Sequence, residues 1–454
     1  MPVTGLRSIL VRVVSAIVEI TAVRLPGRSS PQVVDCALDQ PSADTSRASF
    51  TVELRGWVST SSAPPRAVRV VSLNERSEAV REVVCVVPVD IPRPDVRNTS
   101  ADEDATARGF AVEIGALRLP TRFRLELRLV LEDATNVKLA EVEGTRQAIR
   151  PPTAPVEGDL RPAVIVTTGR SGSTWLSYLL NQHPALVAYG PFKREPRVAA
   201  YWLEIAQALS DPASYKQSLQ PNFGRGQRWW LGDWPEASRA PLNDGLAEGL
   251  LGRETPEALV ELARQRVQAF YDSVAHHQGK HAPAYFVEKS PGLRPRAMEF
   301  MAEAFPGLRD IVLLRDPRDV LCSILAYKQK NPNAVLVRKD PGLDSDFLER
   351  MAGTYRAALA YMRLAGERAI LVRYEDLVED PAKTLAAMLA HLGVDQGNGT
   401  IATMVDARQA GMEVHQTAPS VEQSIGRWRR DLSDGDQSRA NDAFEEALVG
   451  LGYE

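Results

Sequence analysis

The sequence predicts two parts: an all-β sandwich domain, then an α/β domain whose parallel sheet is flanked by helices. At 454 residues the chain is too long for one ordinary domain. Short β-branched runs separated by turn-rich segments precede residue 150, which is typical of a sandwich. From about residue 160, apolar runs alternate with helical patterns. We therefore expect a β-sandwich domain over 1–150, a linker over 151–162 and the α/β domain over 163–454.

Composition and charge narrow the class of protein. Hydrophobic residues make up 44% and charged residues 25% of the chain, as in globular proteins. A net charge of −4 argues against a nucleic-acid binder. The three cysteines, Cys36, Cys85 and Cys322, are odd in number and widely separated, so they indicate neither a disulfide framework nor a metal cluster. This pattern favours a cytoplasmic location.

The N-terminal segment is apolar overall, but Arg7, Arg12 and Glu19 interrupt it. Its longest uncharged runs, 1–6 and 13–18, are far shorter than the roughly 20 residues that cross a bilayer. No convincing cleavage site of a signal peptide follows. We expect a packed strand or helix here and no integral membrane segment, with a peripheral membrane contact as the alternative.

The β pattern is clearest over residues 122–132, RFRLELRLVLE. Alternate residues are apolar and charged, which indicates a strand with one buried face. The apolar set is Phe123, Leu125, Leu127 and Leu129, and the charged set is Arg124, Glu126 and Arg128. Similar runs lie at 50–58, 67–73, 82–89 and 109–117. The region holds no cluster of catalytic groups, so we expect it to be accessory.

The second part contains four candidate strands, at 163–168, 284–290, 309–315 and 368–377. The first and third are continuous apolar runs of the kind that a parallel sheet buries on both faces. Helices between the strands should cover those faces.

A glycine- and hydroxyl-rich turn, GRSGST at 169–174, joins the first of these strands to a helical pattern. In that context backbone N–H groups and the helix N-terminus point at one spot, where an anion is stabilised. Ser171, Ser173 and Thr174 add hydroxyl donors, and Arg170 adds a permanent cation. The plain alternative is a tight strand-to-helix turn. A Walker A nucleotide loop needs a lysine directly after Gly172, and this sequence has none there.

The segment GRSGSTWL resembles the 5′-phosphosulfate loop of sulfotransferases that use 3′-phosphoadenylyl sulfate (PAPS). The resemblance implies a P-loop-like turn that holds the 5′-phosphate and sulfonate, in which Arg170 stabilises the leaving phosphate. The residues that it assigns to this site are Gly169, Arg170, Ser171, Gly172, Ser173, Thr174 and Trp175.

A second motif, IVLLRDPRDVLCSIL at 311–325, resembles the 3′-phosphate motif of the same family. The resemblance assigns Arg315 and Ser323 to the 3′-phosphate of the adenosine. An arginine fork and a hydroxyl on the first turns of a helix suit a terminal phosphate dianion. Arg318 is a further candidate ligand, but Arg318 and Asp319 also fit a solvated pair at a helix start.

Three further segments agree with this family in order and approximate spacing. VEKSPG at 287–292 resembles a strand end whose lysine, here Lys289, lies near the transferring sulfonate. VRYEDL at 372–377 resembles a family segment that we interpret as scaffold. SIGRWRRDLS at 424–433 resembles a loop that closes over the nucleotide, in which Arg427 adds a phosphate contact and Trp428 packs nearby. The resemblance thus covers residues 160–435.

The general base is predicted from chemistry and position. Sulfuryl transfer needs an acceptor that loses its proton while it attacks in line with the leaving phosphate. Related enzymes often carry a glutamate shortly after the first helix, and here the next carboxylate is Glu195. Glu288 and His183 are the alternatives. A salt bridge with Arg194 or Arg197 is the plain interpretation of Glu195, and a helix C-cap that of His183.

The acceptor region is expected between residues 203 and 283, where the family keeps acceptor-binding insertions. NFGRGQRWWLGDW at 222–234 carries three tryptophans that suit a sugar or a lipid, or that pack a lid on itself. The front β-domain resembles the small β-sandwich that precedes some bacterial sulfotransferases and glycosyltransferases. Glycan recognition, homodimerisation and simple scaffolding are all open roles for it.

The resemblance implies a PAPS-dependent sulfotransferase of the bacterial or carbohydrate type. We expect it to need no metal, because Arg170, Lys289 and backbone donors neutralise the charge. The expected acceptor is a carbohydrate, a glycolipid or a small hydroxylated metabolite. One alternative is a P-loop phosphotransferase that binds ATP with magnesium. Another is a non-catalytic nucleotide- or glycan-binding protein.

Overall fold

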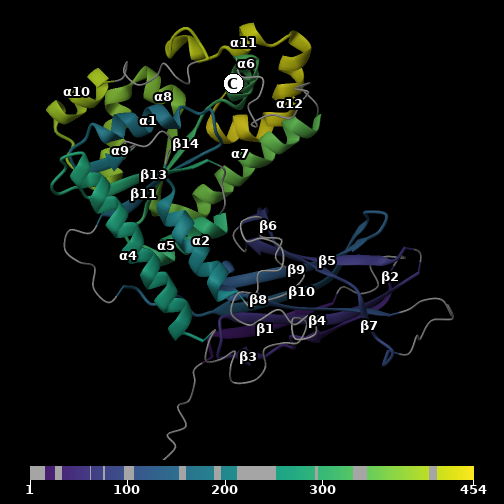
Figure 1. The fold of residues 1–454 in the computed structure, drawn as a ribbon. Coiled ribbons are helices and arrows are strands. Elements are labelled where there is room, and N and C mark those ends of the chain that lie inside the picture. The colour runs from purple at the N-terminus through teal and green to yellow at the C-terminus, as the bar shows by residue number, and fades with distance from the viewer. Residues whose placement is uncertain are drawn as a thin grey trace, which may run out of the picture. The chain divides into compact units, whose positions relative to one another are not determined.

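The structure is a computed structural model of the 454-residue chain. It describes residues 16–25, 33–61, 63–74, 77–96, 107–152, 160–188, 196–211, 252–291, 295–330, 345–407 and 417–453. Two compact units divide these residues (Figure 1). The first draws on Met1–Leu73, Glu82–Ala148 and Gln207–Leu259, and the second on Asn74–Arg81, Ile149–Ala206 and Val260–Glu454. The domain boundaries expected at 150 and 162 stay predictions.

Two sheets account for the β-rich part of the chain. One has the order β3-β1-β10-β9-β5-β6 and the other the order β2-β4-β8-β7. Their strands are β1 (Val18–Arg24), β2 (Val33–Gln40), β3 (Ser46–Arg47), β4 (Thr51–Thr60), β5 (Pro65–Asn74), β6 (Ser77–Pro88), β7 (Ile91–Pro92), β8 (Arg108–Gly115), β9 (Arg122–Leu131) and β10 (Asn136–Arg146). The pairs β1–β3, β1–β10, β9–β10, β5–β9, β2–β4, β4–β8 and β7–β8 are antiparallel, as the sequence predicts for a sandwich.

Strand β9 shows the alternation that its sequence predicts, with one difference. Phe123, Leu125, Leu127 and Leu129 are all buried. Glu126 belongs to the charged set, but it is also buried, because Arg128 pairs with its carboxylate at 2.7 Å and Lys138 lies near it on β10. The charged face of this strand is therefore covered by its own ion pairs rather than fully solvated.

The second unit contains a five-stranded parallel sheet with helices over both of its faces (Figure 1). Its order is β12-β13-β11-β14-β15. The strands are β11 (Arg161–Thr167), β12 (Leu186–Ala188), β13 (Tyr285–Pro291), β14 (Arg309–Leu314) and β15 (Ala369–Arg373). Four lie on the predicted runs, but the run at 368–377 is only half correct, because β15 ends at Arg373 and residues 374–377 belong to a helix. The fifth strand, the three-residue β12, is too short to produce a periodic signal.

Helices precede and follow the strands of this sheet along the chain. In chain order they are α1 (Ser173–Asn181), α2 (Val198–Ser210), α4 (Glu254–His277), α5 (Pro295–Ala304), α6 (Pro317–Lys330), α7 (Ser345–Ala365), α8 (Tyr374–Glu379), α9 (Pro381–Leu392), α10 (Asn398–Asp406), α11 (Trp428–Asp431) and α12 (Asp434–Leu451). Within the described residues, none of the helices has the length and apolar character needed to cross a bilayer.

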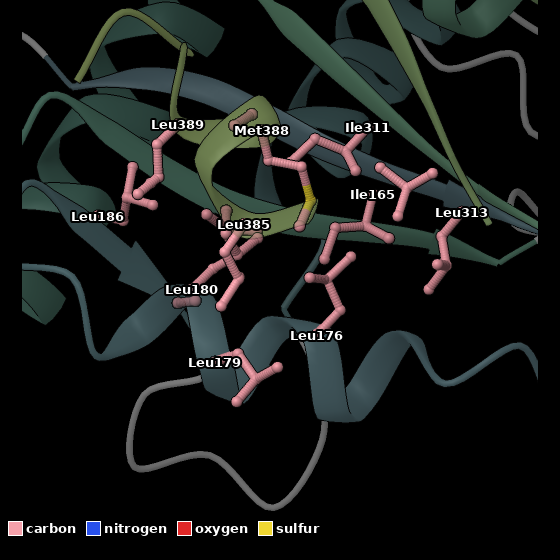
Figure 2. Packing of buried hydrophobic residues seen from close by; sticks show 14 of the residues in the cluster. Ile165, Leu176, Leu179, Leu180, Leu186, Ile311, Leu313, Leu385, Met388 and Leu389 are labelled. Carbon is pink, nitrogen blue, oxygen red and sulfur yellow. The ribbon is translucent and has the colours of Figure 1, made fainter. Parts of the chain in front are cut away.

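On the central strands, odd-numbered and even-numbered side chains point to opposite faces of the sheet. Ile165 on β11 and Ile311 on β14 are odd-numbered and pack with α1 and α9 in one buried cluster (Figure 2). Val287 of β13 joins the same cluster. Even-numbered Phe286 faces the other way and stacks on Tyr271 of α4, with ring centroids 4.1 Å apart. Because side chains alternate along a strand, this parity extends to the polar residues at the strand ends.

Candidate functional site

The turn between β11 and α1 has an unusual backbone. Gly169, Arg170 and Gly172 have φ values of 82°, 54° and 84°, all in the left-handed region. Gly172 is the N-cap of α1 and, as a glycine, has no side chain of its own to cap the helix. The N-terminus of a helix directs its first N–H groups at whatever lies before it, which favours an anion. The arginine at φ 54° is strained, because only glycine adopts this conformation freely.

Tyr374, the first residue of α8 directly after β15, packs against this turn. Its ring lies so close to Gly172 that an added Cβ would meet the ring carbon Cε2 at 2.5 Å. The same ring packs edge-on against Trp175, with centroids 6.0 Å apart. Its hydroxyl is 3.0 Å from the hydroxyl of Ser424. Gly172 is therefore required both by its backbone angle and by the ring beside it.

Arg170 extends from the turn to helix α6. Its Nε donates to the hydroxyl of Ser323 at 3.2 Å, and its guanidinium lies 4.6 Å from the ring centroid of Tyr327. Ser323 and Tyr327 are four residues apart on one helix and so share a face. Burial lowers the pKa of Arg170, and the positive charges of Arg315 and Arg427 lower it further. We call Arg170, Arg315 and Arg427 the arginine cluster.

Arg315 is a buried cation that lies against an aromatic ring and a backbone carbonyl. It is 4% exposed, and its guanidinium lies 4.5 Å from the ring centroid of Tyr374. One terminal nitrogen donates to the carbonyl oxygen of Ser424. Its Nε is buried and has no hydrogen-bond partner within the part of the chain that the structure describes. A buried cation with an unused donor fits a site for an anionic ligand, because leaving it unpaired is costly.

The two other predicted phosphate ligands of this region lie near Thr417. The hydroxyls of Ser323 and Thr417 are 3.0 Å apart. Arg427 donates to the carbonyl oxygen of Thr417 at 3.2 Å, and its Nε donates to Asp431 at 2.6 Å. The structure thus brings Arg170, Ser323 and Arg427 into one network, although they are far apart in sequence. Trp428, directly after Arg427, is buried, as expected for a packing residue.

Arg318 and Asp319 are not a solvated pair, because both are buried. The guanidinium of Arg318 forms a fork with Asp316, with contacts of 2.7 and 3.0 Å, and lies 3.9 Å from the ring centroid of Trp428. Asp319 accepts the backbone N–H groups of Gly426 and Trp428 at 2.7 and 3.0 Å. Burial raises the pKa of Asp319 to about 6. Both residues therefore anchor the 424–433 loop, and Arg318 is committed to Asp316.

Lys289 and Glu288 are adjacent on β13 but face opposite sides of the sheet. The Nζ of Lys289 donates to the hydroxyl of Thr174 in the first turn of α1, at 3.1 Å. Glu288 faces α2 and α4, where its Oε1 accepts three hydrogen bonds. The donors are the Val198 and Ala199 amides, both at 2.9 Å, and the Tyr271 hydroxyl at 2.8 Å. Glu288 caps the N-terminus of α2 and does not face the turn that holds Arg170.

Burial raises the pKa of Glu288 to about 7, although its three hydrogen bonds and Arg197 favour the ionised form. A carboxyl group that titrates near neutrality is often catalytic. In this structure the carboxyl group completes the N-terminus of α2, on the other face of the sheet from Lys289. Glu288 is thus a capping residue, and its role as the alternative base stays a prediction.

His183, just after the end of α1, is hydrogen-bonded to backbone groups of the protein. It is fully buried; its Nε2 is 2.9 Å from the carbonyl oxygen of Asp395, and its Nδ1 accepts the Ala185 amide at 3.0 Å. The amide fixes Nδ1 as an acceptor, so Nε2 carries the proton. Glu195 and residues 222–234 lie outside the described residues, so their predicted roles stay predictions.

Sequence reasoning missed several residues around the arginine cluster. The pattern of the YEDL segment suggests scaffold, yet Tyr374 contacts the turn, Arg315 and the C-terminal loop. One signal points to it: Tyr374 directly follows β15, and the carboxyl ends of parallel strands are where such domains bind ligands. Tyr327 and Thr417 carry no such signal, because only the folded chain brings them to Arg170 and Ser323. Within the described residues, no group of three or more His, Cys, Asp or Glu side chains is placed to hold a metal ion.

Comparison with known proteins indicates one family. The model described as "Sulfotransferase family" matches residues 162–397. No curated protein sequence matches this chain. Among solved structures, the sulfotransferase domain of a Synechococcus olefin synthase is 21% identical, over 68% of this chain and 99% of that chain, with a TM-score of 0.36.

Two further structures have similar values. A mouse sulfotransferase complexed with PAP is 14% identical over 64% of this chain and 87% of that chain, with a TM-score of 0.36. A sulfotransferase from Mycobacterium avium is 17% identical over 66% of this chain and 78% of that chain, also with a TM-score of 0.36.

The contact between Gly172 and Tyr374 predicts that adding a methyl group at position 172 lowers the unfolding free energy. Gly172→Ala adds left-handed strain of about 1–2 kcal/mol, and displacing the ring adds roughly 1–3 kcal/mol. Gly279→Ala is the matched control, because Gly279 has φ 69° and nothing within 4 Å of an added Cβ. Urea denaturation should show a larger loss of unfolding free energy for Gly172→Ala. Equal losses contradict the contact.

The raised pKa of Glu288 predicts a pH-dependent stability. The folded carboxyl titrates near 7 and the reference value is 4.5, so the folded state binds this proton more tightly. Its contribution is present below pH 4.5 and is lost as pH rises through 7. Glu288→Gln keeps an oxygen acceptor but cannot titrate. The unfolding free energy of wild type minus variant should fall by roughly 1–3 kcal/mol between about pH 5 and 7.5.

Urea denaturation at both pH values checks this expectation. Glu379→Gln, at an exposed carboxylate of α8, is the matched control. A difference between wild type and Glu288→Gln that stays constant with pH shows that Glu288 does not carry the linkage.

Proposed function

Because the chain belongs to the sulfotransferase family, we propose that it transfers a sulfonate group from PAPS to a hydroxyl or amine of an acceptor. The observation that carries this proposal is the buried Nε of Arg315, which has no partner among the described residues and belongs to the arginine cluster. Such a concentration of positive charge suits a ligand with two separate anionic groups. PAPS carries a phosphosulfate at one end of its ribose and a 3′-phosphate at the other.

The residues divide into two groups around such a ligand. The turn from Gly169 to Gly172, the start of α1 and Lys289 would hold the phosphosulfate. Arg315 and Ser323 would hold the 3′-phosphate, and Arg427 lies in the same network. The hydrogen bond from Arg170 to Ser323 joins the two groups across the site. This division supports donor binding at the carboxyl edge of the sheet, where parallel-sheet domains bind ligands.

The chemistry would depend on cations and on one base. PAPS supplies an activated sulfonate, and negative charge develops on the phosphate that departs. Arg170 and Lys289 would stabilise that charge, which is the main task of such a site. Glu195 is the proposed general base that takes the proton of the acceptor. Lys289 is oriented by Thr174, which keeps its ammonium at the first turn of α1.

The acceptor class and the setting of the reaction are finer parts of the proposal. We propose a carbohydrate, glycolipid or small hydroxylated metabolite as acceptor, and a cytoplasmic protein. The competing proposal, a P-loop phosphotransferase, has less support. Ser173 stands where the Walker A lysine is required, and Arg315 rather than a carboxylate follows β14.

Nucleotide choice tests the donor. The 3′-phosphate product PAP should raise the melting temperature of the protein without magnesium, and 5′-AMP, which lacks that phosphate, should raise it much less. A phosphotransferase would instead be stabilised by ATP with magnesium. Equal stabilisation by PAP and 5′-AMP contradicts the assignment of Arg315 and Ser323.

Removing the buried guanidinium of Arg315 measures how much it contributes to the free energy of PAP binding. Arg315→Ala should weaken PAP binding by roughly 1.5–3 kcal/mol, the scale of charge-assisted hydrogen bonds. Isothermal titration with PAP measures the value. Arg363→Ala, at an exposed position of α7, removes the same charge and should leave PAP affinity unchanged. If the two variants bind PAP equally well, Arg315 is not a ligand.

Binding and chemistry can be separated at Glu195. Glu195→Gln keeps the size of the side chain but cannot accept the proton. PAP affinity should stay within about threefold of wild type, while kcat falls roughly 10²–10⁴-fold. Turnover is measured on an acceptor found by screening labelled PAPS against a lysate of the source organism. A structural Glu195 would lower the melting temperature instead and leave kcat per folded molecule nearly unchanged.

A further inference from the structure

The backbone at Arg315 is held on both sides. Its carbonyl oxygen accepts the hydroxyl of Tyr355 at 2.7 Å. The following amide, of Asp316, donates to Glu375 Oε1 at 3.0 Å. Glu375 is 5% exposed, so this hydrogen bond lies in a buried setting. The direction of the Arg315 side chain therefore depends on where the Glu375 carboxylate is held.

The other oxygen of that carboxylate is held by the end of α12. The hydroxyl of Tyr453 donates to Glu375 Oε2 at 2.5 Å. Tyr453 reaches this position because Gly452 ends the helix in the left-handed conformation, at φ 69°. The Tyr453 amide then donates back to the Leu448 carbonyl oxygen at 2.9 Å, which turns the chain inward.

The ring of Tyr453 is fixed independently of its hydroxyl. The guanidinium of Arg373 lies 4.4 Å from its ring centroid. The ring also packs at the edge of the buried cluster that contains Phe444 and Leu448 of α12. A change that removes only the hydroxyl should therefore leave the ring in place, and its effect reports on the bond to Glu375.

We propose that Tyr453 is a positioning residue for the 3′-phosphate site, acting through Glu375 and the Asp316 amide on Arg315. The proposal rests on the proposed function, because the ligand of Arg315 is taken to be a 3′-phosphate. Its basis is the unbroken series of hydrogen bonds from the Tyr453 hydroxyl to the backbone at Arg315. Burial makes the series strong, because a low local dielectric strengthens each hydrogen bond.

Tyr453→Phe tests the proposal with the full chain. Loss of one hydrogen bond to a buried carboxylate corresponds to roughly a 3–30-fold change. PAP affinity should fall within that range, and 5′-AMP affinity should stay within about twofold, because only PAP uses Arg315. The ratio of the two affinities is the decisive value, since general loosening of the fold lowers both.

A matched control is present in the same unit. The hydroxyl of Tyr361 donates to the buried Asp310 at 2.6 Å, at the opposite end of β14 from Arg315. Tyr361→Phe removes this bond and the one that the hydroxyl accepts from Arg368 at 2.9 Å, so it should lower the melting temperature without changing the ratio of PAP to 5′-AMP affinity. In an Arg315→Ala background, Tyr453→Phe should cause no further loss of PAP affinity. Glu375→Gln should lower the ratio of PAP to 5′-AMP affinity as Tyr453→Phe does. It is the replacement test if Tyr453→Phe folds poorly.

The outcomes are distinct. If Tyr453→Phe lowers the melting temperature but keeps the affinity ratio of wild type, Tyr453 is only structural and the inference is wrong. A further loss in the Arg315→Ala background overturns the route through Arg315. If wild type itself binds PAP and 5′-AMP equally, the 3′-phosphate assignment fails and the inference falls with it.

Discussion

Mutual repulsion within the arginine cluster is the constraint on which the rest of the site depends. Buried Arg315 and Arg427 lie near enough to Arg170 to lower its pKa. Aromatic rings oppose part of this repulsion, because Arg170 lies on Tyr327 and Arg315 on Tyr374. Arg427 pairs with the carboxylate of Asp431 instead. A ring stabilises a cation without neutralising it, so the positive potential is kept for a ligand.

Tyr374 connects the parts of the site that the chain supplies from separate segments. Its ring contacts Gly172 of the first turn, lies under Arg315 and meets Trp175 edge-on. Its hydroxyl reaches Ser424 in the C-terminal loop. One rigid side chain thus sets the spacing between the two predicted phosphate sites. Such rigidity matters for transfer chemistry, because reacting groups must be held within fractions of an ångström.

Because β13 is pleated, the adjacent residues Glu288 and Lys289 point to opposite faces of the sheet. Lys289 faces α1 and belongs to the candidate site, whereas Glu288 faces α2 and completes that helix end. Glu288 has the pKa expected of a catalytic acid or base, yet burial alone produces it. A raised pKa by itself therefore does not identify a catalytic carboxyl group, because burial in a helix cap raises the pKa as well.

The sequence by itself determined the local features: the period-2 strands, the apolar runs of the parallel sheet, the glycine-rich turn before a helix and the motif around Arg315. These depend on residues close in the chain, where periodicity and turn chemistry act directly. Tertiary structure alone decided that Arg318 binds Asp316, that Tyr327 supports Arg170 and that Tyr453 reaches Glu375. The first contact replaces a solvated pair, because packing buries Arg318 and Asp319. The other two join segments far apart in the chain, the turn before α1 with α6 and the end of α12 with α8. Periodicity and turn chemistry act only between near neighbours, so only the packing of the folded chain produces such contacts.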